Sequence, residues 1–121
     1  MIMLNMKSGV PIFEQIRESI KKQILADILP PGEKLPSVRV LAGELGINPN
    51  TIQKAYTELE SDGFVYTVSG KGVFVSEKNE GLLMKEQSLK LVELKKALEN
   101  AREAGVSKEV ILDLVEKEYT L

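Results

Sequence analysis

The chain has 121 residues, of which 43 % are apolar, and its formal net charge is −2. This size and composition predict one main domain with a hydrophobic core, followed by a smaller appendage. The sequence contains neither cysteine nor histidine, which excludes disulfides, thiolate nucleophiles, the usual zinc sites and histidine-based acid–base catalysis. We therefore expect no enzymatic activity, no bound metal and no cofactor.

The sequence also lacks the signals of a membrane or secreted protein. No stretch approaches the roughly 20 apolar residues that a membrane span needs. The opening residues, MIMLNM, are too few for a signal peptide, and no small-residue cleavage site follows them. We expect a soluble, cytoplasmic protein with no membrane partner.

Charge is distributed unevenly between two parts of the chain. Residues 1–76 hold eight basic and eight acidic residues, whereas residues 77–121 hold eight basic and ten acidic ones. The first part is therefore neutral, although nucleic-acid-binding domains usually present a basic patch. Any attraction to nucleic acid would have to come from the placement of a few cations.

The first predicted element is an amphipathic helix. Apolar residues recur every three or four positions, at Ile12, Phe13, Ile16, Ile20, Ile24 and Ile28. Pro11 suits its first turn, and the segment LPPGEKLP, residues 29–36, ends it. On this pattern Arg17, Lys21 and Lys22 lie off the buried face.

Two short helices joined by a tight turn follow. Ser37 is a good N-cap for an amphipathic helix that carries Val38, Leu41, Ala42 and Leu45. Gly46 can adopt the left-handed conformation that stops this helix, and Asn48 caps the next one, with Pro49 as its first residue. The pattern predicts a helix-turn-helix whose second helix spans about residues 49–61.

The second of these helices has a polar outer face. Ile52, Ala55, Tyr56 and Leu59 face inward, and Asn50, Gln53, Lys54 and Thr57 face outward. Such side chains can read base edges or bind phosphate, although an ordinary solvated face has the same composition. The acids Glu58, Glu60 and Asp62 come late, so we expect the N-terminal end to point at nucleic acid. We expect the Tyr56 ring to be half-buried, with its hydroxyl at the surface and within reach of a phosphate.

Residues 64–76 predict a β-hairpin. Phe64, Tyr66 and Val68 alternate, as do Val73 and Val75, and the sequence SGKG separates the two runs. A hairpin after a helix-turn-helix is a wing, with Lys71 at its tip. SGKG is also common in plain hairpin turns, and it lacks the pattern of a phosphate-binding P-loop.

Taken together, the motifs PPGEKLPSVR, GINPNT, AYTELESDG and GKGVFV resemble the N-terminal winged-helix domain of the GntR family of bacterial transcription regulators. The resemblance covers roughly residues 10–76, and the short tail resembles the YtrA-type branch. It implies a dimer, usually a repressor, that binds an operator in double-stranded DNA. In this family DNA is contacted by the arginine after PS, here Arg39, by polar residues early in the second helix, and by the wing tip. The predicted DNA-binding residues are Ser37, Arg39, Asn48, Asn50, Thr51, Gln53, Lys54, Tyr56, Gly70, Lys71 and Gly72. The alternative for Arg39 is a surface ion pair with Glu33 or Glu44.

The tail, residues 77–121, predicts two amphipathic helices separated by Gly105, with Ser107 capping the second. Met84, Leu91 and Leu98 are seven residues apart, and Leu94 and Ala101 complete a short heptad-like seam. Helices of this size cannot bury their apolar faces alone, so we expect a symmetric dimer. The alternative is that they pack back on the first helix. The predicted dimerisation residues are Met84, Leu91, Leu94, Leu98, Ala101, Ile111, Leu114 and Val115.

The sequence therefore predicts a mainly α protein with a small β-hairpin: a winged helix-turn-helix domain, residues 1–76, and a helical dimerisation hairpin, residues 77–121. The predicted function is that of a sequence-specific DNA-binding regulator, acting as a homodimer on a palindromic operator. The alternative is a winged-helix module that binds another protein and not DNA. The tail is too small for a ligand pocket of its own, so an unknown small-molecule effector would bind at the dimer interface.

Overall fold

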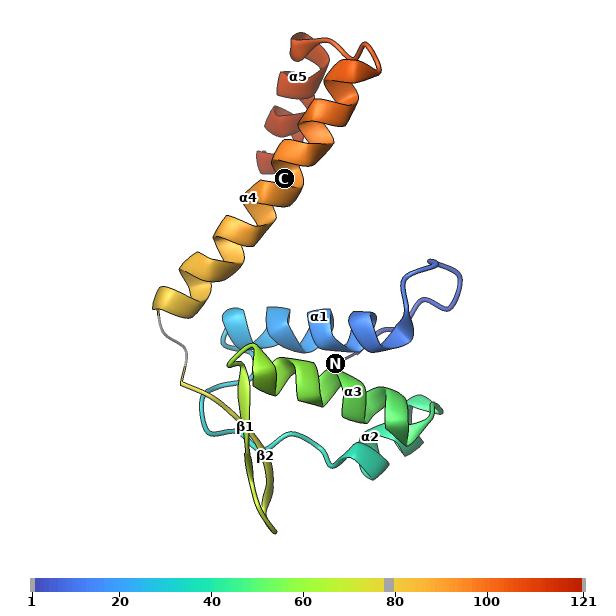
Figure 1. The fold of residues 1–121 in the computed structure, drawn as a ribbon, viewed down its shortest axis with the longest axis vertical. Coiled ribbons are helices and arrows are strands. Elements are labelled where there is room, and N and C mark those ends of the chain that lie inside the picture. Colours follow the sequence, from blue (N-terminus) through green and yellow to red (C-terminus); the bar gives the residue numbers. More distant parts are fainter. Residues whose placement is uncertain (1, 78–79, 121) are drawn as a thin grey trace. The chain divides into compact units, whose positions relative to one another are not determined.

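The computed structural model describes residues 2–77 and 80–120, which form five helices and one two-stranded antiparallel sheet (Figure 1). The chain divides into two compact units, Met1–Leu82 and Leu83–Leu121. The first holds three helices and the hairpin, and most of the second is helical. The expectation of a mainly α protein with a small β-hairpin is confirmed.

Helix α1, Ile12–Leu25, forms one wall of the core of the first unit. Ile16, Ile20 and Ile24 are all buried, as the spacing predicted. The helix ends earlier than expected, because Asp27 adopts a left-handed conformation with φ 59° and the Gln23 carbonyl accepts the Ile28 N–H at 2.9 Å. Ile28 is consequently 65 % exposed, and its assignment to the buried face was wrong.

Helices α2, Val38–Leu45, and α3, Pro49–Ser61, complete the helical part of this unit. Helix α3 packs on both α1 and α2, so it lies at the centre of the domain. Its residues Ile52, Ala55 and Leu59 are fully buried. Burying side chains of this kind contributes on the order of 1.5–3 kcal/mol for each large one, which makes α3 a rigid element for whatever its outer face binds.

Strands β1, Val65–Val68, and β2, Gly72–Val75, form the predicted hairpin, in which Val65 pairs with Val75 and Val68 with Gly72. The segment before α2 joins the edge of β2, since the Leu35 N–H donates to the Val73 carbonyl at 2.8 Å. The alternation differs from the expected one: Phe64 and Val65 are both buried, and Tyr66 is exposed. Phe64 lies in the turn after α3, where its N–H donates to the Leu59 carbonyl, so the strand begins one residue later.

Helix α4, Glu80–Glu103, continues from the first unit into the second, and α5, Lys108–Tyr119, follows it. Gly105, at φ 87°, ends α4, and the Ser107 hydroxyl caps α5 by accepting the Val110 N–H at 3.3 Å. The chain therefore reverses between the two helices as the sequence predicted. Over the residues described, no helix has both the length and the apolar content needed to cross a membrane.

Candidate nucleic-acid interface

The turn between α2 and α3 is built by local capping interactions. The Ser37 hydroxyl accepts the Val40 N–H at 3.2 Å at the start of α2, and Gly46 stops that helix at φ 67°. Asn48 Oδ1 accepts the Asn50 N–H at 2.8 Å, and Pro49 begins α3. These contacts confirm the predicted caps, and they fix where the first turn of α3 begins.

The first turns of α3 present polar side chains to solvent. Asn48, Asn50 and Gln53 are exposed, and Thr51 is half-buried. The Gln53 amide nitrogen donates to the Thr57 hydroxyl at 3.2 Å, so the acceptor capacity of the Gln53 carbonyl oxygen is not used in this contact. Amide groups on an exposed helix end are the groups that read adenine edges in a major groove.

Lys54, the one cation in the α3 sequence, makes a contact within the domain. Its ammonium lies 3.9 Å from the centre of the Phe13 ring on α1, within the range of a cation–π interaction. The residue is nevertheless exposed. Lys54 therefore connects α3 to α1 and presents a charge at the surface at the same time.

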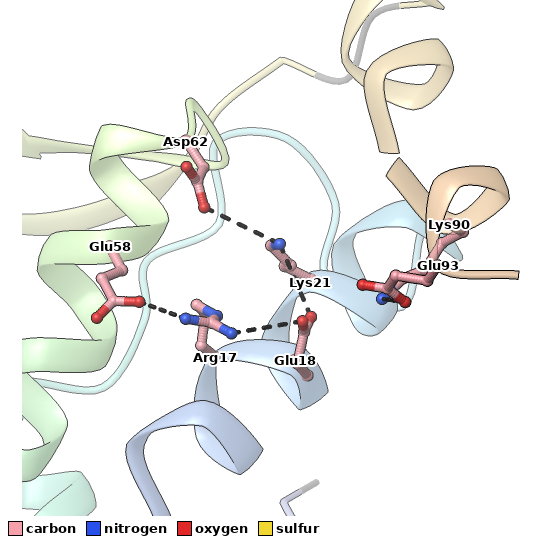
Figure 2. A network of polar contacts seen from close by, with 7 residues as sticks. All are labelled: Arg17, Glu18, Lys21, Glu58, Asp62, Lys90 and Glu93. Atoms are coloured by element: carbon pink, nitrogen blue, oxygen red, sulfur yellow. Dashed lines mark hydrogen bonds and ion pairs between the residues drawn. The ribbon is translucent and has the colours of Figure 1, made fainter. Parts of the chain in front are cut away.

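The acidic end of α3 is neutralised by α1 (Figure 2). Glu58 forms a salt bridge and hydrogen bond with Arg17, and Asp62 lies 3.9 Å from the Lys21 ammonium. Burial would lower the pKa of Arg17, but the Glu58 hydrogen bond and the charges of Glu18, Glu58 and Glu14 outweigh it, so that pKa is raised. The carboxylates of Glu58 and Asp62 are therefore paired with cations of the same domain.

Two features of this network differ from the sequence expectation or were missed by it. Lys21 was expected off the buried face, but it is 8 % exposed, and its ammonium lies 5.3 Å from the centre of the Phe64 ring. The pairing of Arg17 and Lys21 with Glu58 and Asp62 was also missed. The available signal was spacing. Arg17 and Lys21 are four residues apart, as are Glu58 and Asp62, so the two cations lie on one helix face and the two acids on another.

The hairpin ends in the predicted basic tip. Lys71 is exposed, and Gly70 before it has φ 76°, a conformation that glycine adopts without strain. At Gly72, with φ 129°, a Cβ atom would lie 2.8 Å from Lys34 Cε. The Lys34 side chain therefore passes the wing at Gly72, the strand residue next to the tip, and it adds a second exposed cation that sequence reasoning missed.

Arg39 is exposed near the start of α2. Among residues 2–77 and 80–120 it forms no salt bridge, so the alternative pairing with Glu33 or Glu44 is not present. Its guanidinium is left available to a ligand outside the domain. Ser37, two residues earlier, is also exposed, although its hydroxyl already caps α2.

Tyr56 does not lie as the sequence suggested. Its side chain is 3 % exposed, and its hydroxyl donates to the Pro36 carbonyl at 2.7 Å. Burial, with a smaller effect from the charge of Glu44, raises the pKa of Tyr56 to about 12. The expected surface hydroxyl was wrong, and we assign Tyr56 to the packing between α3 and the segment before α2.

The arrangement of α2, the tight turn, the central α3 and the following hairpin defines a winged helix-turn-helix protein. The sequence of residues 12–75 matches the family model of the gntR family of bacterial regulatory proteins. The chain is also 39 % identical to the HTH-type transcriptional repressor YtrA of Bacillus subtilis, over 97 % of this chain and 91 % of that protein. The chain belongs to the GntR family, and the resemblance noted in the sequence is confirmed.

Solved structures have a similar fold. A protein of Listeria monocytogenes EGD-e, described as a transcriptional antiterminator, has a TM-score of 0.81 and 38 % identity, covering 98 % of this chain and 89 % of its own. The DNA-binding domain of AraR, solved in complex with operator ORR3, has a TM-score of 0.54 and 32 % identity, covering 61 % of this chain and 89 % of its own.

Proposed function

We propose that this chain is a transcriptional repressor that binds a palindromic DNA operator as a homodimer. The observation that carries the proposal is the division of charge on the first unit. The acids late in α3 are held by Arg17, Lys21 and the wing, where Glu60 accepts the Thr67 N–H at 3.0 Å. The polar early end of α3 and the cations outside this network remain exposed.

This division explains how a domain with no net charge can bind DNA. Arg39, Lys34 and Lys71 are exposed and form no salt bridge within the described part of the chain. Cations of this kind bind phosphate and set the register of a protein on the duplex. Asn50 and Gln53 on the rigid α3 would then read base edges. The positive potential would come from the positions of a few cationic side chains and not from an excess of basic over acidic residues.

The relatives support the same function. YtrA is a repressor, and it is similar to this chain over nearly the whole length of both proteins. The AraR domain was solved on an operator, and the gntR family match over residues 12–75 includes Arg39, Asn50 and Lys71 here. The proposal includes no catalytic step and no cofactor, and it places the regulator in the cytoplasm with its DNA target.

We assign DNA binding to residues 1–76 and dimerisation to residues 77–121, which include the whole second unit, Leu83–Leu121. Large apolar side chains are exposed along α4 and α5, among them Leu91 at 63 % and Leu114 at 59 %. Of the predicted dimerisation residues, Met84, Leu94, Leu98 and Val115 are exposed, and Ala101 and Ile111 are half-buried. An apolar surface of this extent usually marks a contact with another chain. A second copy would cover it and bring two α3 helices to two half-sites.

The proposal is tested by selecting bound duplexes from a random pool at low salt. We expect enrichment of an inverted repeat whose half-sites lie about 34–36 Å apart, or a multiple of that distance. Binding to the selected duplex should weaken steeply as salt is raised, since phosphate contacts release counterions. If no duplex is enriched, DNA binding is rejected, and the winged-helix domain is better explained as a protein-interaction module.

A further inference from the structure

A pocket of about 480 Å³ lies inside the first unit, between α1, α2, α3 and the segment that precedes α2. Six apolar side chains form most of its wall, namely Ile2, Ile20, Leu29, Leu35, Leu41 and Leu45. Its volume is within the range of about 300–1,000 Å³ that is usual for small-molecule sites. The predicted face of α3 and the wing tip do not line it.

Three polar side chains border this pocket, those of Gln23, Glu44 and Tyr56. The Gln23 amide nitrogen donates to the Ser19 hydroxyl at 3.2 Å. Among the described residues of its wall, Glu44 on α2 is the one that carries a charge, and its carboxylate is acceptor-only when ionised. The Tyr56 hydroxyl also borders the pocket, but its proton is donated to the Pro36 carbonyl at 2.7 Å. The Tyr56 oxygen can therefore only accept a further hydrogen bond. A bound molecule would need an apolar body for the walls and a donor, best a cation, for this end.

We propose that this pocket binds a small organic cation with an apolar body, such as an aralkyl amine. An anion would meet the Glu44 carboxylate, and the described lining residues include no cation to offset it. A neutral hydrocarbon would fill the apolar walls but gain no favourable contact with Glu44, which is exposed and would keep its water. Charge complementarity therefore selects one class of ligand from the three.

The pocket is connected to the elements that carry the proposed DNA contacts. Pro36 lines it and is followed by Ser37, which caps α2, and by Arg39. Leu41, Glu44 and Leu45 lie on α2 itself. A ligand here would contact the helix that presents Arg39, which makes the pocket a candidate effector site. This regulatory part rests on the proposed DNA-binding function, whereas binding of the cation does not.

The binding site is tested on the full chain without DNA, by nitrogen–proton correlation spectra during titration. Three probes share one body and differ in charge: 4-phenylbutylamine, 4-phenylbutanol and 4-phenylbutyrate. We expect shifts at the amides of Leu35, Leu41, Glu44 and Leu45, with the amine binding tightest. Glu44→Gln should weaken amine binding by roughly three- to tenfold and leave the alcohol unchanged. Glu33→Gln, the same charge change at an exposed site outside the pocket, should alter neither.

The proposal is overturned if these amides do not shift, if the three probes bind equally, or if Glu44→Gln and Glu33→Gln behave alike. Melting curves of both variants show whether a loss of binding reflects a loss of folding. The effector role is measured separately, as the change in affinity for the selected duplex at saturating amine. An unchanged affinity would reject that role while leaving the binding site in place, and a failure to bind any duplex would reject the proposed function alone.

Discussion

The Lys54 ammonium on α3 lies 3.9 Å from the centre of the Phe13 ring on α1. Lys54 is the one cation in the α3 sequence, so the residue expected to meet phosphate is also a link between two helices. A cation–π contact at an exposed site contributes about 0.5–1 kcal/mol. Part of any interaction between Lys54 and DNA would be offset by weakening this contact.

Two substitutions separate these roles. Lys54→Gln removes both the cation–π contact and the charge, so we expect a loss of about 0.5–1 kcal/mol of unfolding free energy and weaker DNA binding. Phe13→Leu removes the ring and keeps the charge, so it should destabilise the fold without lowering the salt dependence of binding. The logarithmic salt slope should fall by about 0.9 in Lys54→Gln only. Equal slopes in the two variants would show that Lys54 does not contact phosphate.

Arg39 and Lys71 are the cations that we expect to contribute most to operator binding. Replacing either residue by alanine should weaken binding and make the salt slope smaller by about one. Each is exposed, forms no salt bridge with the residues that the structure describes, and can contact phosphate. Circular dichroism should show unchanged folding. Lys95→Ala on α4 is the matched control, since it removes an exposed cation from the second unit. Unchanged affinity in both Arg39→Ala and Lys71→Ala would reject the assigned face.

The successes and failures of the sequence predictions have a common physical basis. Ser37, Gly46 and Asn48 act on backbone groups within four residues, so their effects can be predicted from local sequence. The family motifs then placed the wing and Arg39 on the surface. Two of the positions that were wrong, Lys21 and Tyr56, depend on partners far along the chain. Lys21 is covered by Phe64, and the hydroxyl of Tyr56 is bound by Pro36.

The same reasoning explains why the pocket of the first unit could not be predicted from the sequence. The tail is indeed short, but the pocket in the first unit forms only where α1 and α2 meet the loop between them and Tyr56. No single motif encodes such a space. Its charged group, Glu44, is an ordinary exposed residue of α2 in the sequence pattern, and its significance depends on the neighbours that folding brings to it.

The Arg17–Glu58 pair should stabilise the domain more than an ordinary surface pair. The two side chains are 20 % and 33 % exposed, and Arg17 Nε is buried with no hydrogen-bond partner in the described structure. Glu58→Gln would leave the guanidinium poorly compensated, so we expect a loss of about 1–2 kcal/mol in urea unfolding. Glu93→Gln removes the partner of an exposed pair with Lys90 and should change stability by less than about 0.5 kcal/mol. Similar losses of unfolding free energy in the two variants would show that the Arg17–Glu58 pair stabilises the domain no more than an exposed pair does.

Tyr56 should make the stability of the protein fall at alkaline pH. Burial raises its pKa to about 12, above the ordinary value of about 10. The folded state therefore favours the neutral phenol, and this contribution is complete below about pH 10 and is lost as the pH rises toward 12. Tyr56→Phe should be less stable at pH 8 by about 1 kcal/mol, because the hydrogen bond to Pro36 is lost. The difference between the two proteins should shrink between pH 10 and 12. A constant difference would show that the phenol does not titrate with folding.

The exposed apolar residues of α4 should control the oligomeric state. Leu91 and Leu98 are seven residues apart and are 63 % and 40 % exposed. If a second copy covers them, a buried unpaired carboxylate at either position would oppose association strongly. We expect the double variant Leu91→Glu, Leu98→Glu to sediment as a monomer and to bind the operator much more weakly, because two half-sites can no longer be held together. Lys95→Glu on the same helix should remain dimeric. A wild-type chain that sediments only as a monomer at micromolar concentration would contradict the proposed dimer directly.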